Sequence, residues 1–286
     1  MSAIQDRHIA ILCHDKAGAG SSVTRAHLFS EALSGLSVSN KVWETDWPVD
    51  FGNHTDVWIC GGDGTLNRFV NRYPGITLPL GIINGGTGND LFWMLYGQVS
   101  DETLLDRLLH SSPRPVDLVR CNDLYFINGA GIGFEGAVAK ALSGKRKMPG
   151  KASFLLTTLR KIMTYRSASY AVLSEDGELP QGRYLLLDVS NGARAGGGFL
   201  VSPRSRPDDG WLDVVAVEAM PAWKRLRYLP VIEKGGHLDL PFVRHFRTKR
   251  LEISSDRRMG FHLDGEYREA DALHIEILEG RLLFRC

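Results

Sequence analysis

Short apolar runs alternate with amphipathic segments in the first part of the chain. The runs Ile9 to Cys13, Val57 to Cys60 and Leu78 to Ile83 are almost wholly apolar, and Val42 to Thr45 is a weaker one. Short apolar runs bounded by turn residues predict buried strands. Ser22 to Leu33, in contrast, opens on a serine and has apolar positions near helical spacing, which predicts a helix.

Further helices are expected after the later runs, at Leu66 to Arg72, Leu91 to Tyr96 and Thr103 to His110. Strands that alternate with helices in this way predict a parallel sheet covered on both faces. We therefore expect a Rossmann-like α/β domain over residues 1–115. A ligand of such a domain binds at the carboxyl ends of the strands.

The pattern changes at Ser111-Ser112-Pro113-Arg114-Pro115, which we interpret as the hinge to a second domain over residues 116–286. Helices are expected there at Phe134 to Leu142 and Phe154 to Tyr165, and the rest is mainly strand. The expected strands are 116–120, 124–128, 170–173, 184–191, 212–217, 251–254, 260–263, 273–278 and 282–284. Many short strands with glycine turns predict a mainly antiparallel β-sandwich, and its last strand is a candidate to return to the first domain.

The net charge and the spacing of the cysteines indicate which classes of protein this chain can belong to. The formal net charge of +1 argues against a dedicated nucleic-acid binder. The cysteines are scattered without metal-ligand spacing, which fits a reducing cytoplasm. No segment approaches the roughly 20 apolar residues of a transmembrane helix. We therefore expect a cytoplasmic protein that reaches any lipid from the water side.

Glycine-rich turns follow three of the expected strands and carry the main chemical signal. Gly61-Gly62-Asp63-Gly64-Thr65-Leu66-Asn67 comes directly after a buried strand and leads into a helix. Glycine lets backbone N–H groups approach a phosphate closely, and the start of the next helix favours anions. Asp63 can hold a metal ion, and Thr65 can donate a hydrogen bond. The turns at 15–20 and 85–90 lie at the same end of the expected sheet, and Thr87 can contact phosphate or ribose. The turns together predict a nucleotide site.

The same residues resemble a known family. Gly61 to Asn67 and Gly86-Thr87-Gly88-Asn89-Asp90 resemble the catalytic domain of lipid kinases of the diacylglycerol kinase and sphingoid-base kinase type, with the bacterial soluble YegS-like branch fitting best. Later segments resemble further family signatures in the same order: 128–134, 191–198, 202–213 and 264–266. The resemblance therefore covers nearly the whole chain.

The resemblance implies an ATP- and Mg²⁺-dependent kinase that phosphorylates a hydroxyl of diacylglycerol or a related lipid at the inner membrane face. Gly61 to Asn67 and Thr87 would hold ATP, with Thr45 as a further contact, and Asp63 would organise the catalytic Mg²⁺. The second domain would hold the lipid. There, Asp264 or Glu266 would take the proton from the lipid hydroxyl, and we favour Glu266, following the family.

The family also has a structural Mg²⁺ site at an Asp-Gly-x-Leu turn. Carried over to this chain, it consists of the Asp209 carboxylate and the backbone carbonyls of Arg206 and Trp211. Two basic clusters, 145–151 and 244–250, could meet anionic lipid headgroups, although an ordinary polar surface explains them as well.

Departures from the family pattern leave alternatives open. His14-Asp15 stands in place of the usual Asn-Pro, Asn84 in place of a proline and Arg68 in place of a glutamate, and the region from Trp47 to Thr55 is short. A kinase of the NAD kinase type, acting on a soluble substrate, shares the Gly-Gly-Asp-Gly element. A nucleotide-binding protein that has lost catalysis is the other alternative. The sequence identifies neither the lipid nor whether the chain forms a homodimer.

Overall fold

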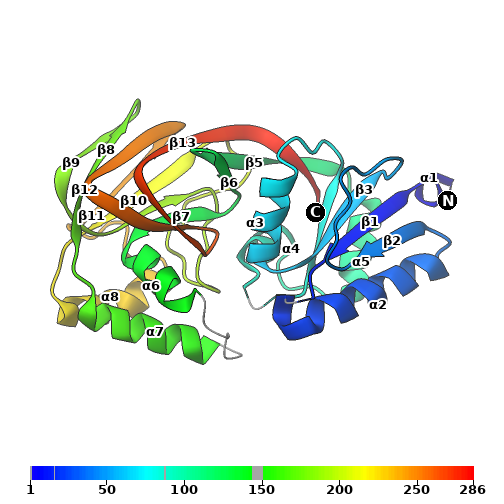
Figure 1. The fold of residues 1–286 in the computed structure, drawn as a ribbon, viewed down its shortest axis with the longest axis horizontal. Coiled ribbons are helices and arrows are strands. Elements are labelled where there is room, and N and C mark those ends of the chain that lie inside the picture. Colours follow the sequence, from blue (N-terminus) through cyan, green and yellow to red (C-terminus); the bar gives the residue numbers. More distant parts are fainter. Residues whose placement is uncertain (1, 16, 87, 144–150) are drawn as a thin grey trace. The chain divides into compact units, whose positions relative to one another are not determined.

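The computed structural model describes residues 2–15, 17–86, 88–143 and 151–286 (Figure 1). The basic residues 145–147 therefore lie outside the described part of the chain. The fold divides into two compact units. Unit 1 comprises Met1–Val116 and Gly280–Cys286, and unit 2 comprises Asp117–Glu279.

Unit 1 is built on parallel strands. In the order β4 (Leu80–Asn84), β3 (Asp56–Gly61), β1 (His8–Cys13) and β2 (Ser39–Trp43), all neighbours pair in parallel. The end of β13 (Glu266–Arg285) joins β4, also in parallel, with Phe284 opposite Leu80. All of β3 and all but the first residue of β1 are buried, as is typical of strands covered on both faces.

Helices follow the strands of unit 1 and pack their apolar sides inward. They are α1 (Ser2–Gln5), η1 (Ala17–Gly20), α2 (Ser21–Gly35), α3 (Asp63–Arg72), α4 (Asp90–Tyr96) and α5 (Asp101–His110). Phe29 and Leu33 of α2, Phe69 of α3 and Leu108 of α5 are buried. The N-terminus of α5 is capped by Ser100, whose side chain accepts a hydrogen bond from the N–H of Thr103.

The buried carboxylate of Asp56 binds arginines from near both ends of the sequence within unit 1. Asp56 is fully buried and pairs with Arg7, whose Nε lies 2.9 Å from Asp56 Oδ2. Arg285 donates from its Nε to the other oxygen at 2.5 Å and from Nη1 to the carbonyl of Ser111 at 2.7 Å. A buried charge is tolerated only when it is paired in this way. Residues far apart in the sequence thus meet at the start of β3.

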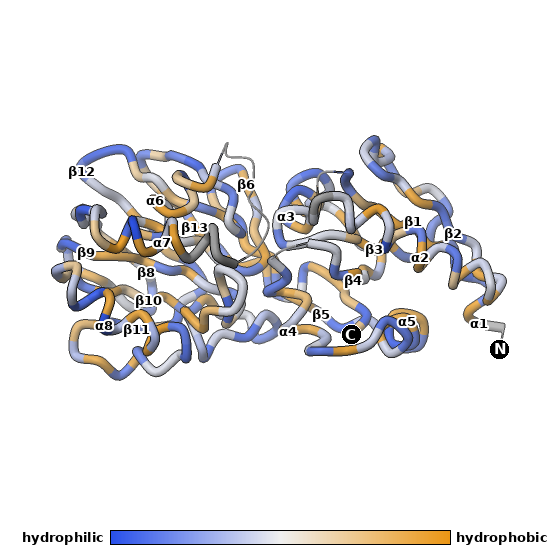
Figure 2. Tube along the Cα trace, turned by 90° about the horizontal axis from the view of Figure 1, so that it is seen from below, coloured by the Kyte–Doolittle hydropathy of each residue, from blue (hydrophilic) through white to orange (hydrophobic). Residues whose placement is uncertain are grey.

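Unit 2 is mainly antiparallel. Its strands are β5 (Pro113–Cys121), β6 (Leu124–Phe126), β7 (Gly129–Gly133), β8 (Ala168–Ser174), β9 (Glu178–Ser190), β10 (Leu212–Glu218), β11 (Val243–Thr248), β12 (Arg250–Leu263) and most of β13. They pair in the order β11-β10-β9-β7-β12-β13, with β8 joined to β9 and β12, and β5 joined to β6 and β13. The alternation of hydrophobic and hydrophilic residues along these strands can be followed in Figure 2.

The two faces of this sheet bury different residues. One face carries the larger apolar core, which includes Ile132, Leu187 and Val214. The other carries Leu186 and Val215. Near this second face lie α6 (Phe134–Leu142), α7 (Lys151–Thr164) and α8 (Ala222–Glu233). Because side chains alternate across a strand, Asp188 and Ser190 share the second face with Leu186.

Several boundaries differ from those the pattern predicts. Helix α8 was not expected; it contains Pro230, and none of its residues is fully buried. Strand β11 was expected only as a basic surface. The segments 273–278 and 282–284 are parts of the single long strand β13, and 251–254 and 260–263 are parts of β12, which has a register shift between Ser254 and Met259. No helix in the described ranges is long and apolar enough to span a bilayer.

Candidate functional site

The glycine turns after β1, β3 and β4 come together within unit 1, as the sequence predicts. The backbones of Gly62 and Gly86 are so close that a Cβ on Gly86 would lie 2.4 Å from the Cα of Gly62. The N–H of Gly85 donates to the carbonyl of Gly61 at 3.0 Å, and the Ser21 hydroxyl donates to the carbonyl of Gly85 at 2.9 Å. Only glycine permits this approach.

Asp63 links two of these turns. Its Oδ2 accepts the N–H of Asp90 at 3.1 Å and its Oδ1 accepts the N–H of Leu91 at 3.4 Å, both at the start of α4. Its own N–H donates to the carbonyl of Gly88 at 3.1 Å. A carboxylate oxygen can accept more than one bond, and carboxylate oxygen is a donor that Mg²⁺ prefers. Asp63 therefore fits a role in holding a metal ion as well as in holding the turn.

The residues that follow Asp63 face inward. The side chains of Thr65, Leu66 and Asn67 are buried in α3. Thr65 points back at Gly61, where an added Cβ would lie 2.3 Å from Thr65 Oγ1. The side chains of Leu66 and Asn67 therefore belong to the packing of unit 1, and the N–H of Leu66 donates to the carbonyl of Gly62 at 3.2 Å.

Two threonines, Thr45 and Thr87, were expected to contact the nucleotide. Thr45 is exposed in a bend two residues after β2. The structure records no hydrogen bond from Thr45 to the glycine turns within the part of the chain that it describes. Thr87 lies outside the described residues.

In unit 2, Asp264 and Glu266 flank Gly265 in the hairpin between β12 and β13. Positive φ angles at Asp264 (48°) and Gly265 (86°) are those of a type I′ turn, which favours Asp-Gly. Both oxygens of the Asp264 carboxylate are engaged by backbone N–H groups. Oδ2 accepts from Ile127 at 3.0 Å, and Oδ1 accepts from Asn128 at 2.9 Å and from Gly129 at 3.1 Å.

Glu266 has a different environment from Asp264. It is exposed, and the structure records no hydrogen bond or ion pair between its carboxylate and another described residue. The two carboxylates that the sequence could not separate therefore differ: Asp264 anchors the hairpin, and Glu266 is accessible to solvent.

A buried polar cluster next to this hairpin was missed by the sequence analysis. Nε2 of His262 lies 3.8 Å from Oε2 of Glu135, and Nδ1 of His262 accepts the N–H of Gly265 at 3.2 Å. Burial lowers the pKa of His262 to about 4, so the ring is neutral at neutral pH. Burial raises the pKa of Glu135 well above its ordinary value, and the charge of Asp188 adds to this effect. His262 thus helps to hold the turn that carries Glu266.

Asp188 extends this cluster along the second face of the sheet. Burial raises the pKa of its carboxyl to about 7; the hydrogen bond donated by Ser190 opposes the shift, and the nearby Asp213 adds to it. The signal that could have revealed the cluster is Gly131. A Cβ there would lie 2.1 Å from Glu135 Oε2 and 2.4 Å from His262 Nε2, and a glycine within a strand often marks such a close approach.

The Asp209 carboxylate, expected in a structural metal site, has two hydrogen-bond partners within the protein. Oδ1 of Asp209 accepts the N–H of Trp211 at 3.1 Å, and its Oδ2 accepts a hydrogen bond from the Arg247 guanidinium. Arg247 also stacks over the Trp211 ring, with its Cζ 5.4 Å from the ring centroid. The Arg206 side chain pairs with Asp208. The Asp209 carboxylate thus has a cationic partner in Arg247, and the Mg²⁺ site expected at this carboxylate and at the carbonyls of Arg206 and Trp211 stays a prediction.

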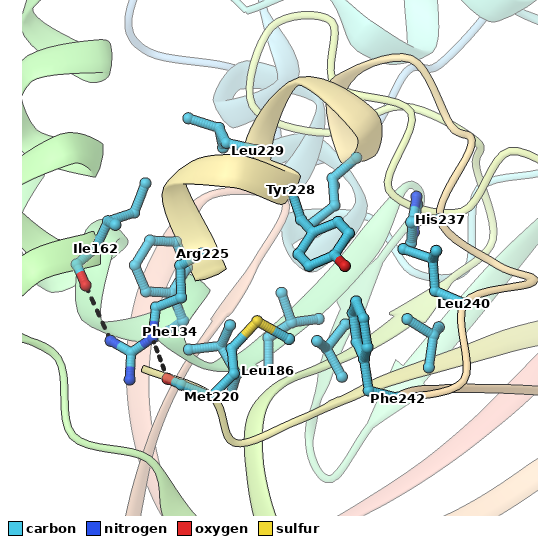
Figure 3. A pocket seen from close by; sticks show the side chains of 14 residues that line it. Phe134, Ile162, Leu186, Met220, Arg225, Tyr228, Leu229, His237, Leu240 and Phe242 are labelled. Atoms are coloured by element: carbon cyan, nitrogen blue, oxygen red, sulfur yellow. Dashed lines mark hydrogen bonds between the residues drawn. The ribbon is translucent and has the colours of Figure 1, made fainter. Parts of the chain in front are cut away.

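Unit 2 contains an apolar pocket between α8 and the second face of its sheet (Figure 3). Almost all of its lining is apolar, and includes Phe134, Leu186, Val217, Leu229 and Phe242. Its open volume of about 40 Å³ is well below the roughly 150 Å³ of an engineered apolar cavity that binds benzene. An apolar ligand could enter only if side chains of α8 moved.

Arg225 holds α8 in place beside this pocket. It donates from Nε to the carbonyl of Met220 at 2.8 Å and from Nη1 to the carbonyl of Ile162 at 3.0 Å (Figure 3). Nη1 also donates to the carbonyl of Tyr165 at 2.8 Å. Burial lowers the pKa of Arg225, yet the group remains charged at neutral pH. The start of α8 is therefore tied to the end of α7.

Comparison with known protein families finds a match in each unit. Residues 8–121 match the diacylglycerol kinase catalytic domain, and residues 129–283 match the YegS C-terminal NAD kinase beta sandwich-like domain. Together these matches describe an N-terminal catalytic domain followed by a β-sandwich-like domain.

Curated relatives agree with these matches. The chain is 32% identical over 227 residues to a "Probable lipid kinase YegS-like" of Pseudomonas aeruginosa, which covers 78% of this chain and 73% of the relative. It is 29% identical over 213 residues to a "Diacylglycerol kinase" of Bacillus subtilis, which covers 73% of this chain and 70% of the relative.

Solved structures share the fold at low identity. A diacylglycerol kinase structure from Bacillus anthracis has a TM-score of 0.72 at 20% identity, covering 98% of this chain and 96% of that one. An NAD kinase from Archaeoglobus fulgidus in complex with ATP has a TM-score of 0.55 at 16% identity, covering 97% and 93%.

Proposed function

The chain belongs to the family of YegS-like lipid kinases with a diacylglycerol kinase catalytic domain, and from this premise we propose that it is an ATP- and Mg²⁺-dependent kinase of a lipid hydroxyl. The acceptor would be diacylglycerol or a related lipid. The observation that carries the proposal is the close packing of the three glycine turns of unit 1, with Asp63 between two of them.

The nucleotide would bind at these turns. Glycine backbones at the carboxyl ends of parallel strands, followed by the start of α3, favour phosphate oxygens, as in Rossmann-like domains. Gly61 to Asn67 would contribute mainly backbone groups, and Thr87 and Thr45 would add hydroxyls. Asp63 would hold Mg²⁺, whose charge would help to neutralise the phosphates.

Glu266 is our candidate for the general base. Phosphoryl transfer to an alcohol needs a carboxylate that can reach the hydroxyl proton. The exposed Glu266 meets this requirement better than Asp264, whose oxygens are engaged by three backbone N–H groups. We assign Asp264 the role of a positioning residue.

The apolar pocket of unit 2 would receive an acyl chain of the acceptor lipid. Its lining offers hydrocarbon contact and few competing polar groups. Because the pocket is small in this conformation, we expect α8 to shift when lipid enters. A kinase with such an acceptor would work from the cytoplasm as a peripheral protein at the inner membrane face.

A transfer assay tests the proposal. Purified protein with radiolabelled ATP and Mg²⁺ is given a panel of diacylglycerol, a sphingoid base, phosphatidylglycerol and NAD, and the labelled product is identified. We expect label in a lipid and loss of that label in Glu266→Gln. Label in NAD alone would support the NAD-kinase alternative. This alternative is tested because the chain shares its fold with an NAD kinase. ATP binding without transfer to any acceptor would support the non-catalytic alternative.

A further inference from the structure

Helix α8 has an apolar stripe on the side that does not line the pocket. Arg225, Tyr228, Leu229 and Ile232 line the pocket. Trp223, Leu226 and Pro230 follow one another at helical spacing on another side and are exposed, with 63% of Trp223 and 41% of Leu226 accessible. A surface helix normally presents charged and polar residues to water. Folding of unit 2 does not explain these exposed side chains.

Helix α7 also has exposed apolar side chains along one side. Leu156 and Met163 are 71% and 60% exposed, with Arg160 between them at the same helical spacing. Thr158 and Ile162, on the other side of the helix, are buried. The two helices contact one another, and Arg225 of α8 bonds to the carbonyl of Ile162 on α7. We call the exposed sides of these two helices the α7–α8 surface.

The charged residues of the two helices that form the α7–α8 surface are almost all basic. The cationic side chains are Arg160, Lys161, Arg166, Lys224 and Arg227, and none of them is ion-paired with another residue that the structure describes. The sequence of the two helices has one acidic residue, Glu233 at the end of α8. Unpaired cations beside exposed aromatic and aliphatic side chains suit a surface that is both anionic and apolar.

The other basic cluster of unit 2 is different. Arg247 pairs with Asp209, Lys249 with Glu279 and Arg250 with Glu276. These cations are neutralised within the protein, so the segment 244–250 is an ordinary salt-bridged surface and not a candidate for lipid headgroups.

We propose that the α7–α8 surface binds a lipid bilayer containing anionic headgroups, with Trp223 and Leu226 inserted at the interface. Tryptophan is favoured at the boundary between headgroups and acyl chains, and lysine and arginine next to it meet the anionic groups. A bilayer also fits better than an acidic protein because α8 is one wall of the apolar pocket. The same helix would then contact the membrane on one side and an acyl chain on the other. This last link rests on the proposed lipid kinase function, whereas membrane binding itself does not.

Vesicle sedimentation tests the inference. Full-length protein is mixed with vesicles of phosphatidylcholine alone, or of phosphatidylcholine with phosphatidylglycerol, and the bound fraction is measured. We expect binding to the anionic vesicles only. The double variant Trp223→Ala/Leu226→Ala and the triple variant Arg160→Gln/Lys224→Gln/Arg227→Gln should each weaken it about tenfold or more.

Two controls keep the test specific. Leu28→Ala/Leu36→Ala removes two exposed apolar side chains from α2 and the residue after it, in unit 1, and should leave vesicle binding unchanged. Circular dichroism and thermal unfolding check that each variant is folded. Unchanged binding by the folded Trp223→Ala/Leu226→Ala variant, or equal binding of the native protein to neutral vesicles, would overturn the inference.

A second measurement separates this inference from the proposed function. With a short-chain, water-soluble diacylglycerol, the α7–α8 variants should retain transfer while losing it on anionic vesicles. Vesicle binding that depends on Trp223, with no transfer to any lipid, would support the surface and contradict the kinase. Transfer to vesicle lipid that is insensitive to the α7–α8 variants would support the kinase and contradict the surface.

Discussion

The carboxylate of Asp264 accepts the backbone N–H of Asn128 at 2.9 Å, and two further N–H groups, of Ile127 and Gly129, complete its environment. The hairpin that carries Glu266 is thereby fixed to the loop before β7. Two carboxylates separated by one residue in the sequence thus have different environments, one engaged by backbone N–H groups and one exposed.

Removal of the Asp264 carboxylate should destabilise the protein. Asp264→Ala leaves three N–H groups without their acceptor and places alanine at positive φ, so we expect a loss of about 2–4 kcal/mol in the free energy of unfolding. Asp264→Asn, which tolerates this backbone, should lose less. Urea unfolding measures both. Glu266→Gln is the matched control and should change stability by about 0.5 kcal/mol or less; an equal loss in Glu266→Gln would contradict the division of roles.

Loss of the Glu266 carboxylate should lower the rate of phosphoryl transfer, although it should leave stability nearly unchanged. If Glu266 is the general base, Glu266→Gln should lower the rate of phosphoryl transfer by about 10²–10⁴-fold. Nucleotide affinity, measured by calorimetry, should be unchanged, because the glycine turns of unit 1 are untouched. A normal transfer rate in Glu266→Gln would rule out Glu266 as the base.

Asp188 should make stability depend on pH. Burial raises the pKa of Asp188 from 3.8 to about 7, so between these values the folded protein retains a proton that the unfolded chain releases. Its contribution to stability is therefore complete below pH 3.8 and is lost as the pH rises through about 7. Relative to native protein, Asp188→Asn should gain roughly 2–4 kcal/mol between pH 4 and pH 8. Urea unfolding across this range checks it, and the exposed Asp239→Asn should run parallel to native protein.

Gly131 should be far less tolerant than its neighbour Gly129. An added Cβ at Gly131 would lie within 2.4 Å of both Glu135 Oε2 and His262 Nε2, whereas at Gly129 the nearest atom is 3.5 Å away. We expect Gly131→Ala to cost about 1–3 kcal/mol and Gly129→Ala to cost less than about 1 kcal/mol. Thermal unfolding of the two variants measures the difference. Equal thermal unfolding midpoints of the two variants would show that the side chains of Glu135 and His262 can move aside without loss of stability.

The pairing of Arg247 with Asp209 predicts a metal-independent fold. Because the guanidinium already neutralises Asp209, the thermal midpoint should be the same in EDTA and in excess Mg²⁺ without nucleotide. Arg247→Met should lower the midpoint and let Mg²⁺ restore part of the loss through the freed carboxylate. A Mg²⁺-dependent midpoint in native protein that disappears in Asp209→Asn would show instead that this turn binds metal.

The elements of unit 1 and the meeting of its glycine turns could be predicted, because the carboxyl ends of parallel strands share one edge of a sheet. The environment of Asp264 could not, since its partners Ile127, Asn128 and Gly129 come more than a hundred residues earlier in the chain. The same holds for Arg247, 38 residues from Asp209. Helix α8 was missed because its two apolar sides lack the single stripe that predicts a helix. Local pattern thus predicted the glycine turns, whereas long-range pairing determines the environments of the carboxylates.

The ion pair between Arg285 and Asp56 has a consequence for synthesis of the chain. Unit 1 contains Met1–Val116 and also Gly280–Cys286, so its last strand is synthesised only after all of unit 2. Until then, Asp56 lacks one of its two arginine partners and β4 lacks a neighbour. A stop codon or a cleavage just before Gly280 would therefore damage the nucleotide unit, although every glycine turn would still be present.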